Sequence, residues 1–84
     1  MAKTSPSPTY PIFPEDAAAV TPNDSADLAQ FSVIYVGGAG NVKVTTAQGS
    51  VVVFSGLMAG QTIPVRVRRV WSGSTTATNL VAIF

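Results

Sequence analysis

The sequence predicts an all-β fold: a small antiparallel β-sandwich or barrel-like module of about five strands, with an extended, proline-rich N-terminal arm. Residues 31–84 contain short runs of β-branched and aromatic residues between glycine-rich turns. All prolines except Pro64 lie within the first 22 residues. The 84 residues include no cysteine and no histidine. A domain this small then lacks disulfides and the usual zinc ligands, so we expect it to oligomerise.

Residues 1–30 form the predicted arm. Its stretch "SPSPTYPIFP" favours an extended, polyproline-like chain, because proline fixes φ and removes a hydrogen-bond donor. Tyr10, Ile12 and Phe13 are apolar and clustered, so we expect them to dock on a protein surface; an unattached terminus is the alternative. Further along, "PEDAAAV" and "TPNDSADLAQ" each fit one short helical turn with proline at the first position.

Residues 31–84 form the predicted β domain. The expected strands are "FSVIYV" (31–36), "NVKVTT" (41–46), "SVVVF" (50–54), "TIPVRVRRVW" (62–71) and "NLVAIF" (79–84). In the fourth strand Ile63, Val65 and Val67 alternate with other residues and share the phase of a core-facing side. Pro64 places this strand at a sheet edge or at a strand start, because proline cannot donate to a central ladder.

The stretch "GGAG" at residues 37–40 is similar in composition to a phosphate-binding turn. A Walker loop needs Lys-Ser/Thr after its glycines, and both it and a dinucleotide fingerprint lead into a helix. Here the strand-like "NVKVTT" follows at once. We therefore predict a hairpin turn between two strands, in which glycine supplies the positive φ values.

The distribution of charge excludes ordinary enzyme chemistry. The arm carries one lysine and four acidic residues, whereas residues 31–84 carry Lys43, three arginines and no acid at all. A domain without aspartate, glutamate, histidine or cysteine offers no general base, no carboxylate pair and no metal cage. We therefore expect no enzyme activity, and no catalytic residue, metal site or cofactor.

The arginines Arg66, Arg68 and Arg69 are the main concentration of charge. Arg66 and Arg68 are expected to face outward, whereas Arg69 falls into the core phase, so the strand ends or bulges there or Arg69 is partly buried. A buried guanidinium needs an anionic partner. We expect the arginines to pair with acids of the arm, within or between subunits. These acids are Glu15, Asp16, Asp24 and Asp27.

Trp71 follows the arginines and fits either a lid on the core or an interface anchor. Two alternatives for the arginine strand are a solvated outer face and a surface for single-stranded nucleic acid, which the low overall basicity disfavours. The candidate protein–protein interface residues are Tyr10, Ile12, Phe13, Arg66, Arg68, Arg69 and Trp71.

Three stretches, "VTPNDSADLAQ", "IYVGGAGNVKVTT" and "VVVFSGLMAGQTIPVRVRRVWSGSTTATNLVAIF", also carry a family resemblance. Together they resemble the spike-base proteins of gene-transfer-agent capsids and their relatives in tailed bacteriophages. The resemblance spans about residues 20–84 and includes no catalytic motif.

The resemblance implies a non-enzymatic virion structural protein: a capsid decoration, vertex or spike-base subunit that oligomerises and anchors to the shell or carries a spike or fibre. The implied partners are other copies, with three- or five-fold symmetry left open, and the major capsid protein or a spike or fibre protein. The implied location is the particle surface, on the head rather than the tail, after synthesis in the host cytoplasm. A tail or baseplate adaptor and a single-strand nucleic-acid binding module are the alternatives.

No membrane partner is expected. No apolar run approaches the roughly 18 residues that a membrane span needs. The first residues lack the apolar core of a secretion signal.

Overall fold

A computed structural model describes residues 14–84, and within this range the protein contains six β-strands and no helix. The strands are β1 (Ala17–Ala19), β2 (Ser32–Tyr35), β3 (Gly40–Thr46), β4 (Val51–Leu57), β5 (Thr62–Val70) and β6 (Val81–Ile83). The predicted all-β class is therefore confirmed. No helix in this part of the chain is long and apolar enough to cross a membrane.

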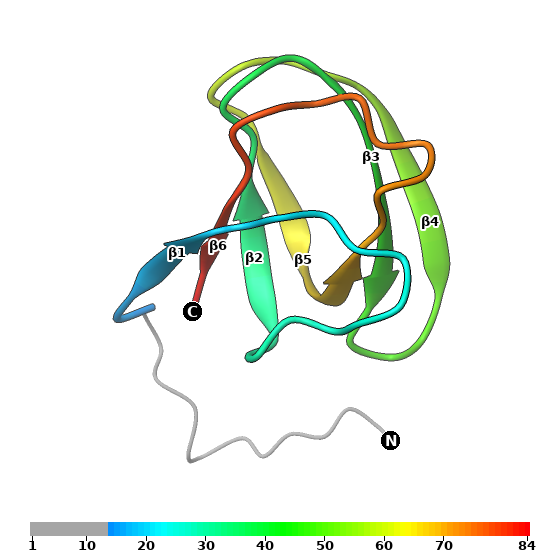
Figure 1. Cartoon of the computed structure of the whole chain (residues 1–84). Coiled ribbons are helices and arrows are strands. Elements are labelled where there is room, and N and C mark those ends of the chain that lie inside the picture. Colours follow the sequence, from blue (N-terminus) through cyan, green and yellow to red (C-terminus); the bar gives the residue numbers. More distant parts are fainter. Residues whose placement is uncertain (1–13) are drawn as a thin grey trace.

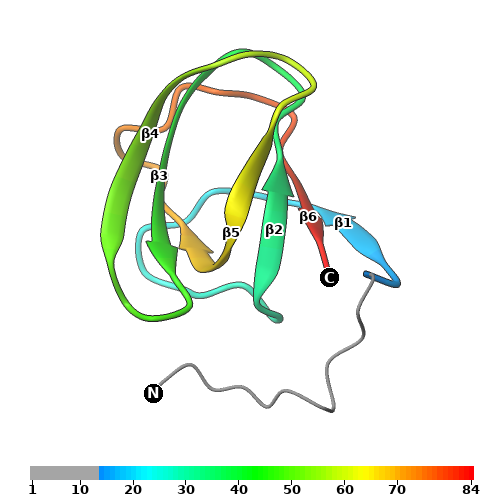
Figure 2. The same ribbon diagram turned by 180° about the vertical axis from the view of Figure 1, so that it is seen from behind.

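The six strands form one open sheet in the order β1-β6-β2-β5-β3-β4. Every neighbouring pair is antiparallel. Figures 1 and 2 show β1 and β4 at opposite ends of this sheet. A tight turn joins β3 to β4: the N–H of Thr46 donates to the carbonyl of Ser50, and Gly49 has a φ of 97°. This turn makes β3 and β4 the sheet's short-range hairpin.

The core lies along the inner residues of the sheet and under two long connections. Ile34, Val42 and Ile63 are fully buried, and burying an aliphatic side chain of this kind stabilises the fold by about 1.5–3 kcal/mol. Ala77 and Leu80 belong to the connection between β5 and β6 and are also buried. The other buried apolar residues are Val36, Val44, Leu57, Val67, Val70 and Ala82. The connections thus close a core that one open sheet would leave uncovered.

The hairpin predicted for the glycine-rich stretch is wrong. β5 lies between β2 and β3, so residues 36–40 pass over the end of β5 instead of turning back into a neighbouring strand. The stretch packs against the connection at residues 76–79, where the N–H of Gly38 donates to the carbonyl of Thr78 at 2.8 Å. A Cβ atom on Gly40 would lie 2.5 Å from the backbone nitrogen of Ala77. Glycine is therefore required here for close backbone approach as well as for its φ of 153°.

Pro64 is the third residue of β5, near the strand start that the sequence allowed, whereas the alternative of an edge strand is wrong because β5 lies inside the sheet. The pairs Ser32↔Val67 and Ile34↔Ile63 show that two steps along β2 match four along β5. Pro64 falls in this irregular stretch, where its missing N–H removes no regular ladder bond. The same irregularity turns Val65 outward, although the alternation placed it in the core: it is 38% exposed.

Near Arg69 the predicted bulge is present. Thr45 pairs with Arg69 whereas Thr46 pairs with Val67, so Arg68 is an additional residue on β5. The bulge changes the phase of the strand and leaves Arg69 partly buried while Val70 enters the core. The sequence left a strand end, a bulge and partial burial of Arg69 open as alternatives, and the structure combines a bulge with partial burial.

The short helical turns allowed within residues 14–30 are not formed. Ala17–Ala19 instead pairs with β6, where backbone hydrogen bonding outweighs the helix propensity of alanine in so short a segment. Further on, the side-chain Oδ1 of Asn23 accepts hydrogen bonds from the N–H groups of Ser25 (2.8 Å) and Ala26 (3.1 Å), which fixes a local turn. The predicted extended arm remains a prediction for residues 1–13, which lie outside the described residues.

Candidate functional site

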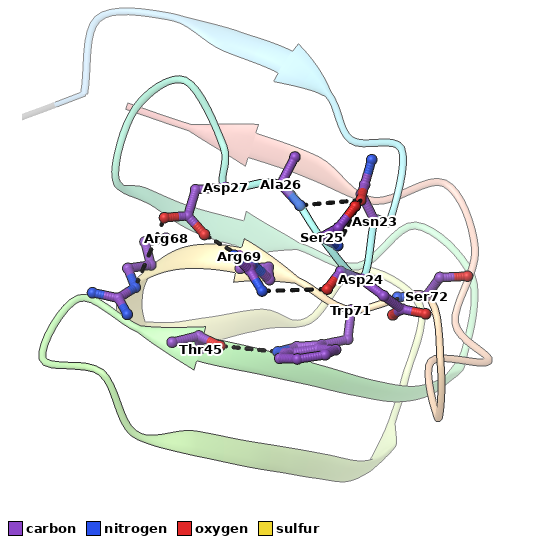
Figure 3. Close-up of polar contacts among 10 residues, drawn as sticks. All are labelled: Asn23, Asp24, Ser25, Ala26, Asp27, Thr45, Arg68, Arg69, Trp71 and Ser72. Atoms are coloured by element: carbon purple, nitrogen blue, oxygen red, sulfur yellow. Dashed lines mark hydrogen bonds and ion pairs between the residues drawn. The ribbon is translucent and has the colours of Figure 1, made fainter.

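Two of the three arginines form the centre of a polar cluster (Figure 3). The Nε of Arg69 donates to Oδ1 of Asp27 at 2.8 Å, and a terminal nitrogen of Arg69 lies 3.3 Å from the carbonyl oxygen of Asp24. The Nε of Arg68 lies 3.9 Å from Oδ2 of Asp27, which makes an ion pair but no close hydrogen bond. The predicted pairing of arginines with these acids is therefore present, and it is made within one chain.

Asp24 extends the cluster to the connection between β5 and β6. Its Oδ1 accepts hydrogen bonds from the backbone N–H groups of Ser72 at 2.7 Å and Gly73 at 3.0 Å. The N–H of Leu28 also donates to the carbonyl of Arg68 at 2.7 Å. Residues 20–31 are thus fastened to the end of β5 and to the residues that follow it. Charge-assisted bonds of this kind are stronger than neutral ones.

Trp71 lies half-buried just after β5, and its ring contacts one hydroxyl and two cationic side chains. Its Nε1 donates to Oγ1 of the buried Thr45 at 2.9 Å. The Nζ of Lys43 lies 4.5 Å from the ring centroid, and the guanidinium carbon of Arg69 lies 5.2 Å from it. Both cations are within the range of cation–π attraction. These contacts fit the lid that the sequence allowed; a role for Trp71 as an interface anchor stays a prediction.

Arg66 takes part in a different contact. One of its terminal nitrogens donates to the backbone carbonyl of Phe31 at 3.2 Å, close to the start of β2. Tyr10, Ile12 and Phe13 lie outside the described residues. The structure therefore brings Arg68, Arg69 and Trp71 into one cluster, and the proposed interface role of all seven candidates stays a prediction.

A double-mutant cycle measures what the ion pair contributes. The coupling between Arg69→Ala and Asp27→Ala is expected to be about 1 kcal/mol, because the bond is short but Asp27 remains partly solvated. The same cycle with Arg68→Ala is expected to give less than about 0.5 kcal/mol. Urea unfolding followed by the fluorescence of the single tryptophan checks both values. Equal couplings for the two arginines would contradict the geometry.

The free edge of β4 is a surface that the sequence interpretation missed. β4 stands at the end of the sheet beside β3, and Val51, Val52 and Val53 are 55%, 39% and 44% exposed. The sequence predicts the apolar run "SVVVF" as a strand but does not give its place in the sheet. The run contains none of the charged residues or prolines that usually protect a sheet edge, so the sequence gives no sign that this strand ends the sheet.

The side chains of the polar cluster make contacts within the chain. The carboxylates of Asp24 and Asp27 are engaged by backbone N–H groups and a guanidinium. Among residues 14–84, no three side chains of the metal-ligating types lie close enough to hold an ion. The cluster therefore stabilises the two long connections, and the candidate functional surface is the exposed edge of the sheet.

A search of solved structures provides the decisive comparison. The capsid of a native GTA particle, computed with C5 symmetry, contains a chain that is 32% identical to this one, with a TM-score of 0.75. The alignment covers 99% of this chain and 95% of that chain. The chain belongs to a family of gene-transfer-agent capsid proteins. Neither a protein-family model nor a curated protein matches the sequence. Membership of this capsid family agrees with the all-β fold described above.

Proposed function

We propose that this chain is a non-enzymatic structural subunit of a virion or of a virus-like gene-transfer particle. The observation that carries the proposal is the match to a chain of a GTA capsid over nearly the full length of both proteins. An internal polar cluster that fastens loops, together with an exposed apolar sheet edge, supports assembly as the task of the fold.

More specifically, we assign the chain to the surface of the head, as a decoration, vertex or spike-base subunit. It oligomerises with other copies and contacts the major capsid protein or a spike or fibre protein. The proline-rich residues 1–13 place Tyr10, Ile12 and Phe13 before β1, and these side chains suit docking onto a neighbouring subunit or the shell. Many copies on a symmetric particle turn weak contacts into firm attachment.

Fractionated particles test this assignment. Purified particles are separated into heads and tails, and the chain is quantified in each fraction by mass spectrometry against the major capsid protein. The chain is expected with the heads, at a fixed ratio to the shell subunit. Recovery with tails alone would replace the head assignment by a tail or baseplate adaptor. Absence of the chain from washed particles would contradict the virion role. In a separate binding assay, affinity for a single-stranded oligonucleotide that falls steeply with salt would favour the hypothesis of a nucleic-acid binding module.

A further inference from the structure

The side of β1, β6 and β2 that faces away from the core is apolar. Ile34 of β2 pairs with Ala82 of β6 and both are buried, so this phase of the strands faces the core. The other phase forms a surface that we call the outer face. Its members pair across the three strands in two rows, Ala17–Ile83–Val33 and Ala19–Val81–Tyr35. None of the three strands contains a charged residue.

The outer face is partly open to solvent. The alanines of β1 are exposed, Tyr35 is 37% exposed, and the valines and isoleucine of the face are only partly buried. Phe31, directly before β2, is 45% exposed and adds a second aromatic ring at this end of the sheet. An antiparallel sheet that packs one face on the core normally carries polar side chains on the other. An apolar outer face over three strands therefore indicates a contact surface.

The described chain begins beside the outer face. The N–H of Asp16 donates to the carbonyl of Phe84, the residue that follows β6, at 2.8 Å. Figures 1 and 2 show the C-terminus next to the start of β1. An extended chain spans about 3.3–3.6 Å per residue, so the four steps from Tyr10 to Pro14 reach about 13 Å. The three strands β1, β6 and β2 cover two strand spacings, about 10 Å. Residues 10–13 are therefore long enough to reach the outer face of their own chain.

The stretch "PTYPIFP" at residues 8–14 suits a face that carries aromatic rings. Its prolines, Pro8, Pro11 and Pro14, recur at every third position, which is the repeat of a polyproline helix. Tyr10 and Phe13 are also three residues apart, so they share one side of such a helix. Proline-rich segments bind aromatic-lined surfaces at low entropic cost, because their backbone is stiff before binding. The stretch contains no charged residue, which matches the absence of charge from the three strands.

We propose that, in the free subunit, Tyr10, Ile12 and Phe13 fold back onto the outer face of β1, β6 and β2 of the same chain. The short reach from Pro14 and the apolar character of both surfaces favour this occupant. The proposal goes beyond the proposed function, in which the same side chains meet a neighbouring subunit or the shell. It gives them a site before assembly, where covering an apolar face keeps free subunits from associating through it.

Disulfide trapping within one chain tests the contact, because the natural chain has no cysteine. Full-length protein carrying Ile12→Cys and Val33→Cys is oxidised at low micromolar concentration, and mass spectrometry measures the intrachain disulfide. The control carries Ile12→Cys and Ala18→Cys. Ala18 is exposed and close to Pro14 in the chain, but its pairing with Ala82 places it in the core phase and off the outer face. An undocked segment reaches Ala18 at least as readily as Val33, whereas docking is expected to make the Val33→Cys disulfide form about tenfold faster.

Two results of the trapping experiment would overturn the proposal. Equal rates for Val33→Cys and Ala18→Cys would show that the segment does not dock on the outer face. Single-cysteine chains, Ile12→Cys and Val33→Cys, are also mixed; covalent heterodimers that form as fast as the intrachain bond would give the face to the arm of another copy. Tyr35→Cys, at a more exposed position of the same face, provides a second attachment point if Val33→Cys fails to fold. In each case, recovery of the chain with heads would still support the virion role.

Binding of the hydrophobic dye ANS gives an independent readout, and the sign of its change separates the alternatives. The double variant Tyr10→Ser and Phe13→Ser is expected to raise ANS fluorescence severalfold, because the outer face loses its cover, while far-ultraviolet circular dichroism stays unchanged. Thr9→Ser, a polar substitution in the same segment, is the control and is expected to leave the fluorescence as it is. With an unattached segment, the double variant would only remove exposed apolar surface. Fluorescence that falls or stays constant would therefore contradict the docking.

Discussion

Gly40→Ala is expected to lower the free energy of unfolding by about 2–4 kcal/mol. The added methyl group would lie 2.5 Å from the nitrogen and 2.7 Å from the Cα of Ala77, and 2.8 Å from the carbonyl carbon of Thr76. These are backbone atoms, so no side-chain rotation relieves the contact. The residue also has a φ of 153°, which side chains rarely adopt. A domain of this length has about 4–12 kcal/mol in total, so the loss is a large part of it.

Gly49→Ala is the matched control. Gly49 also has a positive φ, of 97°, but no heavy atom lies within 4 Å of the place where its Cβ would stand. Its replacement should therefore cost the conformational strain alone, about 1 kcal/mol. Thermal unfolding compares the two variants, since 1 kcal/mol shifts the Tm by about 4–8 °C in a domain of this size. Equal shifts would show that the glycine-rich stretch does not need its close approach to residues 76–79.

Ile63→Ala is expected to destabilise the protein by about 2–5 kcal/mol, because the side chain is fully buried and its removal leaves a cavity. Val65→Ala, two residues further along β5, is expected to cost less than about 1 kcal/mol, since Val65 is exposed. Regular alternation along the strand would instead make both residues part of the core. The pair of variants therefore measures the effect of the bulged stretch around Pro64 on the phase of the strand.

Chemical denaturation of both variants, followed by circular dichroism, checks this expectation. A loss for Val65→Ala that approaches the loss for Ile63→Ala would place Val65 in the core and contradict the register of β2 with β5. A small loss leaves Val65 on the surface, where it is available for contact with another protein.

The polar cluster and the sheet edge differ in how far their groups are used within the chain of this capsid-family protein. Arg69, Asp24 and Asp27 hold the long connections against the end of β5, so the charges that suggested an outward interface are used largely inside the chain. The β4 edge offers apolar side chains and backbone groups instead. The cluster therefore keeps the long connections in place, while the β4 edge leaves apolar side chains exposed.

The amino-acid sequence by itself determined the all-β class and the absence of acids from residues 31–84. It also showed that Arg69, a charged residue, falls at a position where the alternation of the strand expects a core residue. Each follows from composition or from the alternation of side chains along a strand, which are local properties. A bulge was one of the alternatives that the sequence offered near Arg69, because an arginine in the phase of Val65 and Val67 would otherwise point into the core. The resemblance to gene-transfer-agent proteins followed from the order of the residues and agrees with the capsid match.

Only the tertiary structure decided which strands are neighbours. The order of the strands depends on contacts between residues far apart in the sequence, so it determined that "GGAG" passes over β5, that Pro64 lies in an interior strand and that Ala17–Ala19 pairs with β6. It also determined that β4 ends the sheet. The exposure of an apolar strand depends on whether another strand lies beside it, and a run of valines gives no sign of that neighbour's absence.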